Sequence, residues 1–283
     1  MKQFLLCLLG VAVIVGFSLM GGCTKTKTVI KNDTTIVKDT TVITDTVPPL
    51  GDTTNRHIND SIWAYYPLNG NLGDSSGNNH VLSLVGGGAV LGYDQWGNSQ
   101  GALDFNGGSS YAEIADGANF TSPNFTVSLF AMWRQTHGMV FSKVNYNDAT
   151  GATFNLSVDP HNYLDTITYS ISTIGSNICS TPANGGQDMR DPTQAIQVDS
   201  WYHMVISFAN GVMKLYVNGV LVHTETFSST QLIYCSDAPF ILGNWWVSDN
   251  GPAMDGKIDE IRIYSRALKD NEVAYLFKTF MTH

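Results

Sequence analysis

The stretch that decides the fold runs Met254-Asp255-Gly256-Lys257-Ile258-Asp259-Glu260-Ile261-Arg262-Ile263-Tyr264. Polar and apolar residues alternate along it, and this period of two is typical of a β-strand. The alternation predicts two opposite faces, with Asp259, Ile261 and Ile263 on one, and Ile258, Glu260, Arg262 and Tyr264 on the other. A carboxylate on an apolar face is tolerated only when it is paired, hydrogen-bonded or bound to a metal. Asp259 is therefore a candidate ligand for a cation.

Similar short alternating runs fill residues 58–283, including 125–134 and 201–208. Asn218-Gly219 is the strongest two-residue hairpin signal, and it predicts a common core face for Leu215, Val217, Val220 and Val222. One helix is expected near the end, opened by Ser265 or by Lys269-Asp270, where Val273, Leu276 and Phe277 recur at helical spacing. The sequence thus predicts a single all-β domain over residues 58–283, a two-sheet antiparallel sandwich with a short C-terminal helix.

The N-terminus has the layout of a secretory signal. Lys2 precedes an apolar run from Phe4 to Phe17, which is too short to span a membrane, and small residues follow it. Residues 1–22 are expected to be removed. Gly21-Gly22-Cys23 resembles the lipobox of bacterial lipoproteins, in which the cysteine becomes the lipidated first residue; the alternative is an incidental cysteine behind an ordinary signal. The expected location is the cell envelope, as an outer-membrane lipoprotein on the periplasmic or cell-surface side.

Residues 23–57 are Thr-rich and close on Pro48-Pro49. They lack the aromatic and leucine content of a core, which favours a tether that carries the folded domain away from the membrane. A coiled coil or strand array made by several copies is the alternative.

Cysteine use and net charge narrow the possible partners. Export leaves Cys179 and Cys235 as the only pair in an oxidising compartment, either as a disulfide or as two separate thiols. The net charge of −9 and the absence of a basic patch disfavour nucleic acid.

Catalytic motifs are missing from the sequence. No zinc-binding His-Glu-x-x-His, nucleophile turn or phosphate loop occurs, and no strand carries two acids at positions i and i+2 facing a cleft. His203, beside Trp201 in a predicted strand, is interpreted as a packed structural histidine. The protein is predicted not to be an enzyme.

Several ordered landmarks resemble the laminin-G-like jelly-roll domains of the concanavalin A-like superfamily. They run from Trp63 to Phe277 and comprise residues 64–70, 74–78, 102–107, 125–128, 201–205, 216–219 and 256–268. The resemblance implies two antiparallel sheets packed face to face, with the first and last strands side by side.

The resemblance also implies a structural calcium. In the family, acids of the early and late segments hold the ion with nearby carbonyls; Asp74 and Asp259 match the two acids, and the turn at Asn78 could supply carbonyls. The alternative is that Asp74 caps its own Asx-turn and that Asp259 binds backbone or an arginine, without a metal.

Exposed aromatic rings are the candidate ligand contacts. Sugars offer flat CH faces beside hydroxyls, which suits aromatic rings with adjacent amides and acids. The candidates are Trp245 and Trp246, and Tyr93 with Trp96; in each case the ring could instead cover the end of the sandwich. The segment Ser176–Val198 is expected to help form the recognition rim.

Together these observations predict a non-catalytic, lipid-anchored protein that binds a polysaccharide or glycan and carries a structural calcium. An adhesion or assembly module with a protein partner is the alternative from another class, and a glycoside hydrolase is a third.

Overall fold

A computed structural model describes residues 57–144, 152–158, 166–171, 187–227, 229–232, 238–244 and 253–282. The chain divides into two units at Thr53, and every described element belongs to the second unit, Thr54–His283. The predicted signal peptide, Cys23 and all of the predicted tether except its last residue, His57, lie outside the described residues, as do Cys179, Cys235, Trp245 and Trp246.

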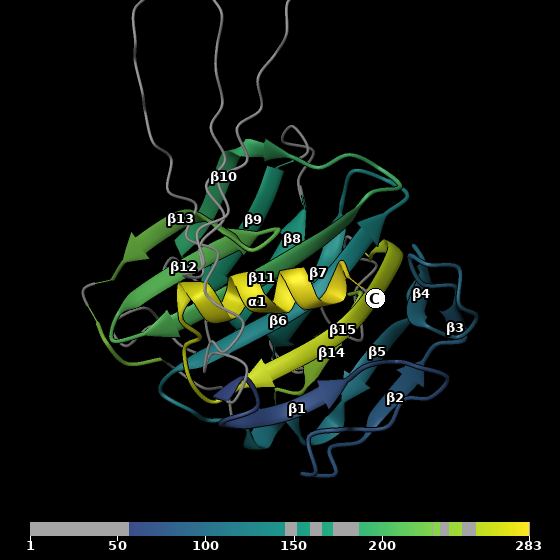
Figure 1. Cartoon of the computed structure of the whole chain (residues 1–283), viewed down its shortest axis with the longest axis horizontal. Coiled ribbons are helices and arrows are strands. Elements are labelled where there is room, and N and C mark those ends of the chain that lie inside the picture. The colour runs from purple at the N-terminus through teal and green to yellow at the C-terminus, as the bar shows by residue number, and fades with distance from the viewer. Residues whose placement is uncertain are drawn as a thin grey trace, which may run out of the picture. The chain divides into compact units, whose positions relative to one another are not determined.

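The described elements form two antiparallel sheets and a C-terminal helix, as the sequence predicted (Figure 1). The first sheet has the order β13 (Val220–Thr226), β12 (Val212–Val217), β11 (Trp201–Ala209), β6 (Phe125–Trp133), β15 (Asp255–Tyr264), β4 (Ala102–Asn106) and β3 (Ala89–Gly92), and β1 (Ile62–Tyr66) also pairs with β15. The second sheet has the order β10 (Gln187–Ala195), β9 (Thr166–Ile171), β8 (Ala152–Val158), β7 (Gly138–Val144), β14 (Phe240–Leu242), β5 (Tyr111–Ile114) and β2 (Leu82–Val85). A 3-10 helix (Ala115–Asn119) follows β5, and α1 (Asp270–Phe280) ends the domain.

The pairing of the first and last strands is confirmed. β1 runs antiparallel to the second half of β15, with Ala64 opposite Ile263 and Tyr66 opposite Ile261. β6 lies on the other side of β15, so the last strand is an inner strand of its sheet. β15 contributes to both cores, since Ile258, Ile261 and Ile263 lie in the main core and Tyr264 packs with α1 residues in the smaller one.

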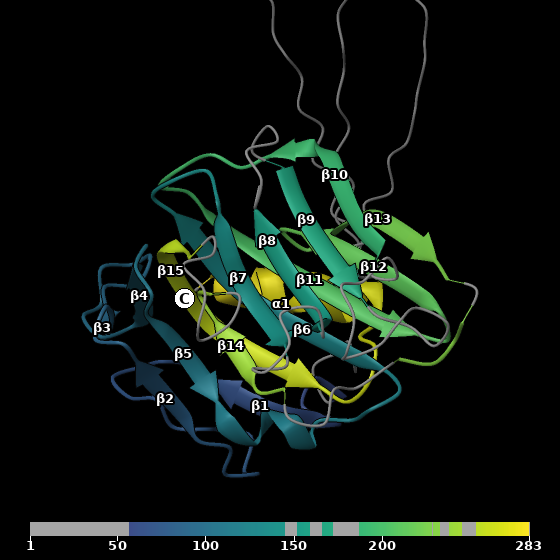
Figure 2. The same ribbon diagram turned by 180° about the vertical axis from the view of Figure 1, so that it is seen from behind.

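The main core lies between the two sheets. It joins buried rings from both of them, including Phe105, Phe125 and Trp133 from the first sheet and Phe141 and Phe240 from the second. The helix α1 crosses the outer face of the first sheet, in front of β11, β6 and β15 in Figure 1 and behind both sheets in Figure 2. There Val273 and Leu276 pack with Tyr216 and Tyr264 in a second, smaller core.

The predicted alternation along β15 is wrong at one point. The register shifts between Asp259 and Arg262, and Glu260 has a left-handed backbone with φ of 53°. This β-bulge inserts an extra residue, so Ile258, Ile261 and Ile263 all reach the main core. Asp259 therefore does not share a face with Ile261 and Ile263, as strict alternation predicted. It lies on the outer side of the sheet, which α1 covers.

The predicted 218–219 hairpin is confirmed, but its core face is only partly correct. Asn218 and Gly219 both have positive φ, 51° and 77°, as a type I′ turn requires. Leu215 and Val217 are buried, whereas Val220 is 63% exposed. β13 is the edge strand, and a register shift between Leu215 and Tyr216 turns part of it away from the core.

His203 is fully buried on β11 beneath α1. Its ring stacks on Phe130 with centroids 4.6 Å apart, and its Nε2 lies 2.9 Å from Ser128 Oγ, while its Nδ1 has no hydrogen-bond partner among the described residues. Burial, with the charge of Arg262, lowers the pKa of His203 from its ordinary 6.5 to about 3. The imidazole is thus a neutral packing element, in keeping with the sequence interpretation.

This burial predicts a loss of stability in acid. Between pH 6.5 and about 3 the unfolded chain binds a proton at His203 that the folded chain does not. The free energy of unfolding should therefore fall by up to about 1.4 kcal/mol per pH unit as the pH drops through this window. Urea denaturation at several pH values should show a shallower pH dependence for His203→Gln than for the control His57→Gln. Parallel pH curves for the two variants would contradict the assignment.

Candidate functional site

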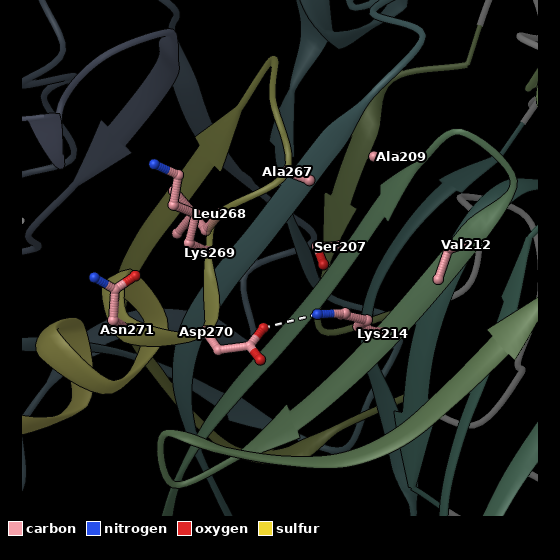
Figure 3. A pocket seen from close by; sticks show the side chains of 9 residues that line it. All are labelled: Ser207, Ala209, Val212, Lys214, Ala267, Leu268, Lys269, Asp270 and Asn271. Atoms are coloured by element: carbon pink, nitrogen blue, oxygen red, sulfur yellow. Dashed lines mark hydrogen bonds and ion pairs between the residues drawn. The ribbon is translucent and has the colours of Figure 1, made fainter.

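Two cavities open on the outer side of the first sheet. One, of about 740 Å³, is lined by Ser207, Ala209, Val212, Lys214, Ala267, Leu268, Lys269, Asp270 and Asn271 (Figure 3). Lys214 reaches from β12 to Asp270 at the start of α1, with Nζ 2.8 Å from Oδ1, and the Tyr216 hydroxyl donates to the same oxygen. The charges of Lys214 and Asp270 in this cavity therefore satisfy each other. No aromatic ring is among the described lining residues of the cavity, so it offers few groups that could recognise a ligand.

The second cavity, of about 600 Å³, is richer in polar and aromatic groups. It lies among β1, the loop 93–98, β15 and α1, and it is lined by Ile58, Asn59, Tyr65, Asn69, Asp94, Trp96, Asn98, Asp259, Glu260, Arg262, Tyr275, Leu276, Thr279 and Phe280. We call it the Trp96 cavity. It brings together Trp96 and Asp259, which the sequence proposed for separate roles.

The loop 93–98 is fixed by the Asp94 side chain. Its Oδ1 accepts hydrogen bonds from the backbone N–H groups of Trp96 and Asn98, each at 2.8 Å, and its Oδ2 accepts from Asn98 Nδ2 at 2.9 Å. From the neighbouring strand, Lys257 Nζ donates to the carbonyl of Tyr93 at 2.6 Å. An aspartate that bonds the backbone two residues on is an Asx-turn, and here it fixes the backbone from which Trp96 projects.

Trp96 lies against the end of α1. Its ring centroid is 4.5 Å from that of Phe280, which in turn stacks on Phe130 of β6 at 3.5 Å. The Trp96 side chain remains 40% exposed, and Tyr93 on the same loop is 61% exposed. An indole supported by a second ring and open to solvent is a ready surface for an apolar face of a ligand.

The β15 bulge delivers Asp259 to the bottom of the cavity. Asp259 is 2% exposed, and its Oδ1 accepts a hydrogen bond from the Glu260 N–H at 2.7 Å. Within the described residues its Oδ2 has no hydrogen-bond donor. Burial raises the pKa of Asp259 to about 8, and the Glu260 carboxylate adds to this effect. Because Asp259 lines the cavity and its Oδ2 is not one of the enclosed side-chain atoms that lack a partner, a group that enters the cavity can contact this oxygen.

Glu260, in contrast, is fully engaged. Its Oε2 lies 2.6 Å from Arg262 Nη1, and the Tyr65 hydroxyl lies 3.2 and 3.0 Å from its two carboxylate oxygens. The Arg262 guanidinium also lies over the Tyr65 ring, 4.0 Å from its centroid. These three side chains form a fixed wall, because each one holds the other two.

Comparison with known proteins identifies the scaffold. The model of the concanavalin A-like lectin/glucanases superfamily matches residues 106–274, more than half of the 283-residue chain. The chain belongs to this superfamily. Among curated proteins, no sequence matches it.

Solved structures with the same superfamily fold include binding domains. Domain 4 of AbnA, a GH43 extracellular arabinanase from Geobacillus stearothermophilus solved in complex with arabinotriose, is 26% identical, with 76% of this chain and 98% of that chain covered and a TM-score of 0.58. The receptor-binding domain of botulinum neurotoxin D is 15% identical over 79% of this chain and 54% of that one, with a TM-score of 0.56. The binding domain of Paraclostridial Mosquitocidal Protein 1 is 20% identical over 79% and 53%, with a TM-score of 0.57. The chain spans about half the length of the toxin domains, which show the fold alone.

Asp74, the first of the residues proposed for calcium, is occupied by the chain itself. Asp74 accepts four hydrogen bonds, from the N–H groups of Tyr65, Ser76 and His80 and from Ser76 Oγ, at 2.8 to 3.0 Å. Burial alone would raise the pKa of Asp74, but these bonds lower it below its ordinary value. A carboxylate has about four lone-pair positions, so Asp74 has none left.

Asn78 and Asp259 do not complete a metal site with Asp74 in this arrangement. The Asn78 amide donates to the carbonyls of Ile62 and Trp63, and Asp259 lines the Trp96 cavity, whose lining does not include Asp74. In the part of the chain that is described, no group of three or more His, Cys, Asp or Glu side chains gathers in a way that could hold a metal. The side chains present do not fit a calcium shared by Asp74 and Asp259, and the calcium stays a prediction from the resemblance.

Melting with and without a chelator tests whether Asp74 is saturated by its own chain or binds calcium. With Asp74 saturated by its own chain, we expect the same melting midpoint in excess EDTA and in millimolar calcium chloride. Asp74→Ala should instead lower the midpoint in both buffers, because it leaves three backbone N–H groups without an acceptor. A midpoint that falls in EDTA and recovers with calcium would restore the metal site.

Sequence reasoning missed most of the Trp96 cavity. The Asp94-x-Trp96-x-Asn98 spacing carries an Asx-turn signal that would have predicted a fixed loop. Tyr65, Asn69, Arg262 and Tyr275 carry no local signal, because they meet only through the pairing of distant strands and the position of α1. Of the predicted rim segment, residues 187–195 form the edge strand β10 rather than a loop.

Proposed function

We propose that this chain is a non-catalytic carbohydrate-binding protein whose sugar site is the Trp96 cavity. The carrying observation is the exposed Trp96 ring beside Asp259, whose Oδ2 has no partner in the described residues. A sugar ring presents apolar CH groups to an indole and hydroxyls to carboxylates and amides. Asn69 and Asn98 supply amides in the same lining.

The construction of the site favours binding without large rearrangement. Asp94 holds the loop, and Phe280 supports one side of the Trp96 ring. A site fixed before the ligand arrives avoids the entropic cost of ordering it. The complex of the 26% identical arabinanase domain with arabinotriose supports sugar binding on this scaffold.

The same geometry argues against hydrolysis. A glycosidase needs two carboxylates free to act on one glycosidic bond. Here Glu260 is held by Arg262 and Tyr65, and both oxygens of Asp94 accept hydrogen bonds from its own loop. Asp259 alone has an oxygen available in the cavity.

The proposal includes the lipid anchor and envelope location, which rest on the N-terminal sequence. Cys23 would carry the lipid, and residues 24–57 would connect it to the sandwich. No helix of the described residues is long and apolar enough to cross a membrane.

Binding is tested on a glycan array, followed by calorimetry with arabinotriose and with any glycan retained. Trp96→Ala should lower the affinity for a retained glycan by about tenfold or more, since it removes the stacking surface. Leu221→Ala is the control, because Leu221 is also an exposed apolar side chain but lies on the edge strand β13. If no glycan is retained, or if Trp96→Ala binds as tightly as the control, the sugar site is not this cavity. Specific capture of a protein partner without any glycan signal would favour the adhesion alternative.

Catalysis is tested on the glycans that bind. We expect no release of reducing ends during prolonged incubation, because only one carboxylate is available. Release that disappears in Glu260→Gln but persists in Asp199→Asn, an exposed acid outside the cavity, would overturn the non-catalytic assignment.

A further inference from the structure

We propose that the Trp96 cavity selects uncharged saccharides and rejects sugars that carry carboxylates, such as uronic and sialic acids. This inference rests on the proposed function and adds a substrate class to it. Its basis is the arrangement of charged side chains around the unpartnered Oδ2 of Asp259.

The described lining has more acids than bases. Asp94, Asp259 and Glu260 are the three acids, and Arg262 is the only lysine or arginine. Lys257, the next cation along β15, is not in the lining; its Nζ is bound to the Tyr93 carbonyl and lies 3.7 Å from Asp104. An incoming carboxylate thus meets an excess of like charge, and such juxtaposition across an interface costs several kcal/mol in general.

Arg262 compensates little, because Glu260 holds its Nη1 and Tyr65 covers its face. Glu260 Oε2 lies 2.6 Å from Nη1, and the guanidinium face lies on the Tyr65 ring. The Arg262 side chain is only 15% exposed, as is that of Glu260. Recognition of a carboxylate uses the open fork of a guanidinium, and here one arm of the fork, Nη1, is already bound to Glu260.

Asp259 sets what the cavity accepts. Asp259 is only 2% exposed, and within the described residues its Oδ2 has no hydrogen-bond partner. A sugar hydroxyl can donate to this oxygen or accept from it, according to the protonation of the carboxyl, and so it satisfies the atom in either state. A carboxylate can only accept, so it finds no donor once Asp259 is ionised, and at any pH near 7 it also faces the charges of Asp94 and Glu260. Neutral hydroxyls are therefore the better match.

The test uses pairs of glycans that differ only in charge. Binding of the whole protein is measured by array and calorimetry for trigalacturonic acid against its methyl ester, and for sialylated glycans against their desialylated forms. We expect the neutral member of a bound pair to bind at least about tenfold more tightly, since like-charge repulsion remains only in the other. Equal or tighter binding of the acidic members would overturn the inference while leaving the sugar site intact. Retention of no glycan of any kind would overturn the proposed function and this inference together.

Substitutions in the Trp96 cavity test whether the preference for neutral glycans arises there. Glu260→Gln releases the guanidinium of Arg262 and removes one negative charge, so the preference for the neutral member should shrink by about tenfold. Asp259→Asn keeps the shape and replaces a carboxyl that is mostly protonated at pH 7, so it should narrow the preference only above pH 8, where Asp259 is ionised. Asp199→Asn removes the same charge from an exposed turn and should leave the preference unchanged. If Glu260→Gln and Asp199→Asn behave alike, the selectivity does not arise from the cavity.

Discussion

The left-handed backbone at Glu260 is the constraint on which the domain depends. It inserts one residue into β15, so that Ile258, Ile261 and Ile263 all face the main core. The same insertion sends two adjacent acids, Asp259 and Glu260, to the outer side of the sheet. Without the bulge a strict alternation would bury Asp259 between the sheets or lose one of the isoleucines from the core. Core packing and the chemistry of the cavity thus have one local cause.

α1 gives those acids their environment. Phe280 stacks on Phe130 and supports Trp96, while Leu276 and Tyr275 close the cavity from above. A carboxyl on an open sheet face would be hydrated and would keep its ordinary pKa. Under the helix, burial raises the pKa of Asp259 and lowers the pKa of His203, so both side chains are mostly neutral at pH 7. The helix is therefore part of the site and not only a cover for the sheet.

Much of the fold could be predicted because its signals are local. The alternation of β6 and β11, the Asn218-Gly219 turn and the spacing in α1 each involve only a few neighbouring residues. The bulge could not be predicted from alternation, because an extra residue looks the same in sequence as a change of face. The cavity could not be assembled either, since Tyr65, Asp94, Asp259 and Tyr275 come from four separate segments. Asp74 was correctly singled out as unusual, but a saturated Asx-turn and a metal ligand need the same residue in the same loop.

The pairing of β1 with β15 has a consequence for how the protein acquires its structure. Tyr65 and Glu260, which meet through a hydrogen bond, are 195 residues apart. Contacts at such separation must close nearly the whole domain before they stabilise it, and proteins dominated by them fold slowly. The last strand is also an inner strand, so until it docks, β1, β4 and β6 expose unpaired edges to other chains. The newly made domain is thus exposed to aggregation until folding is complete. Folding is complete only when the final residues of β15 have paired with their neighbours.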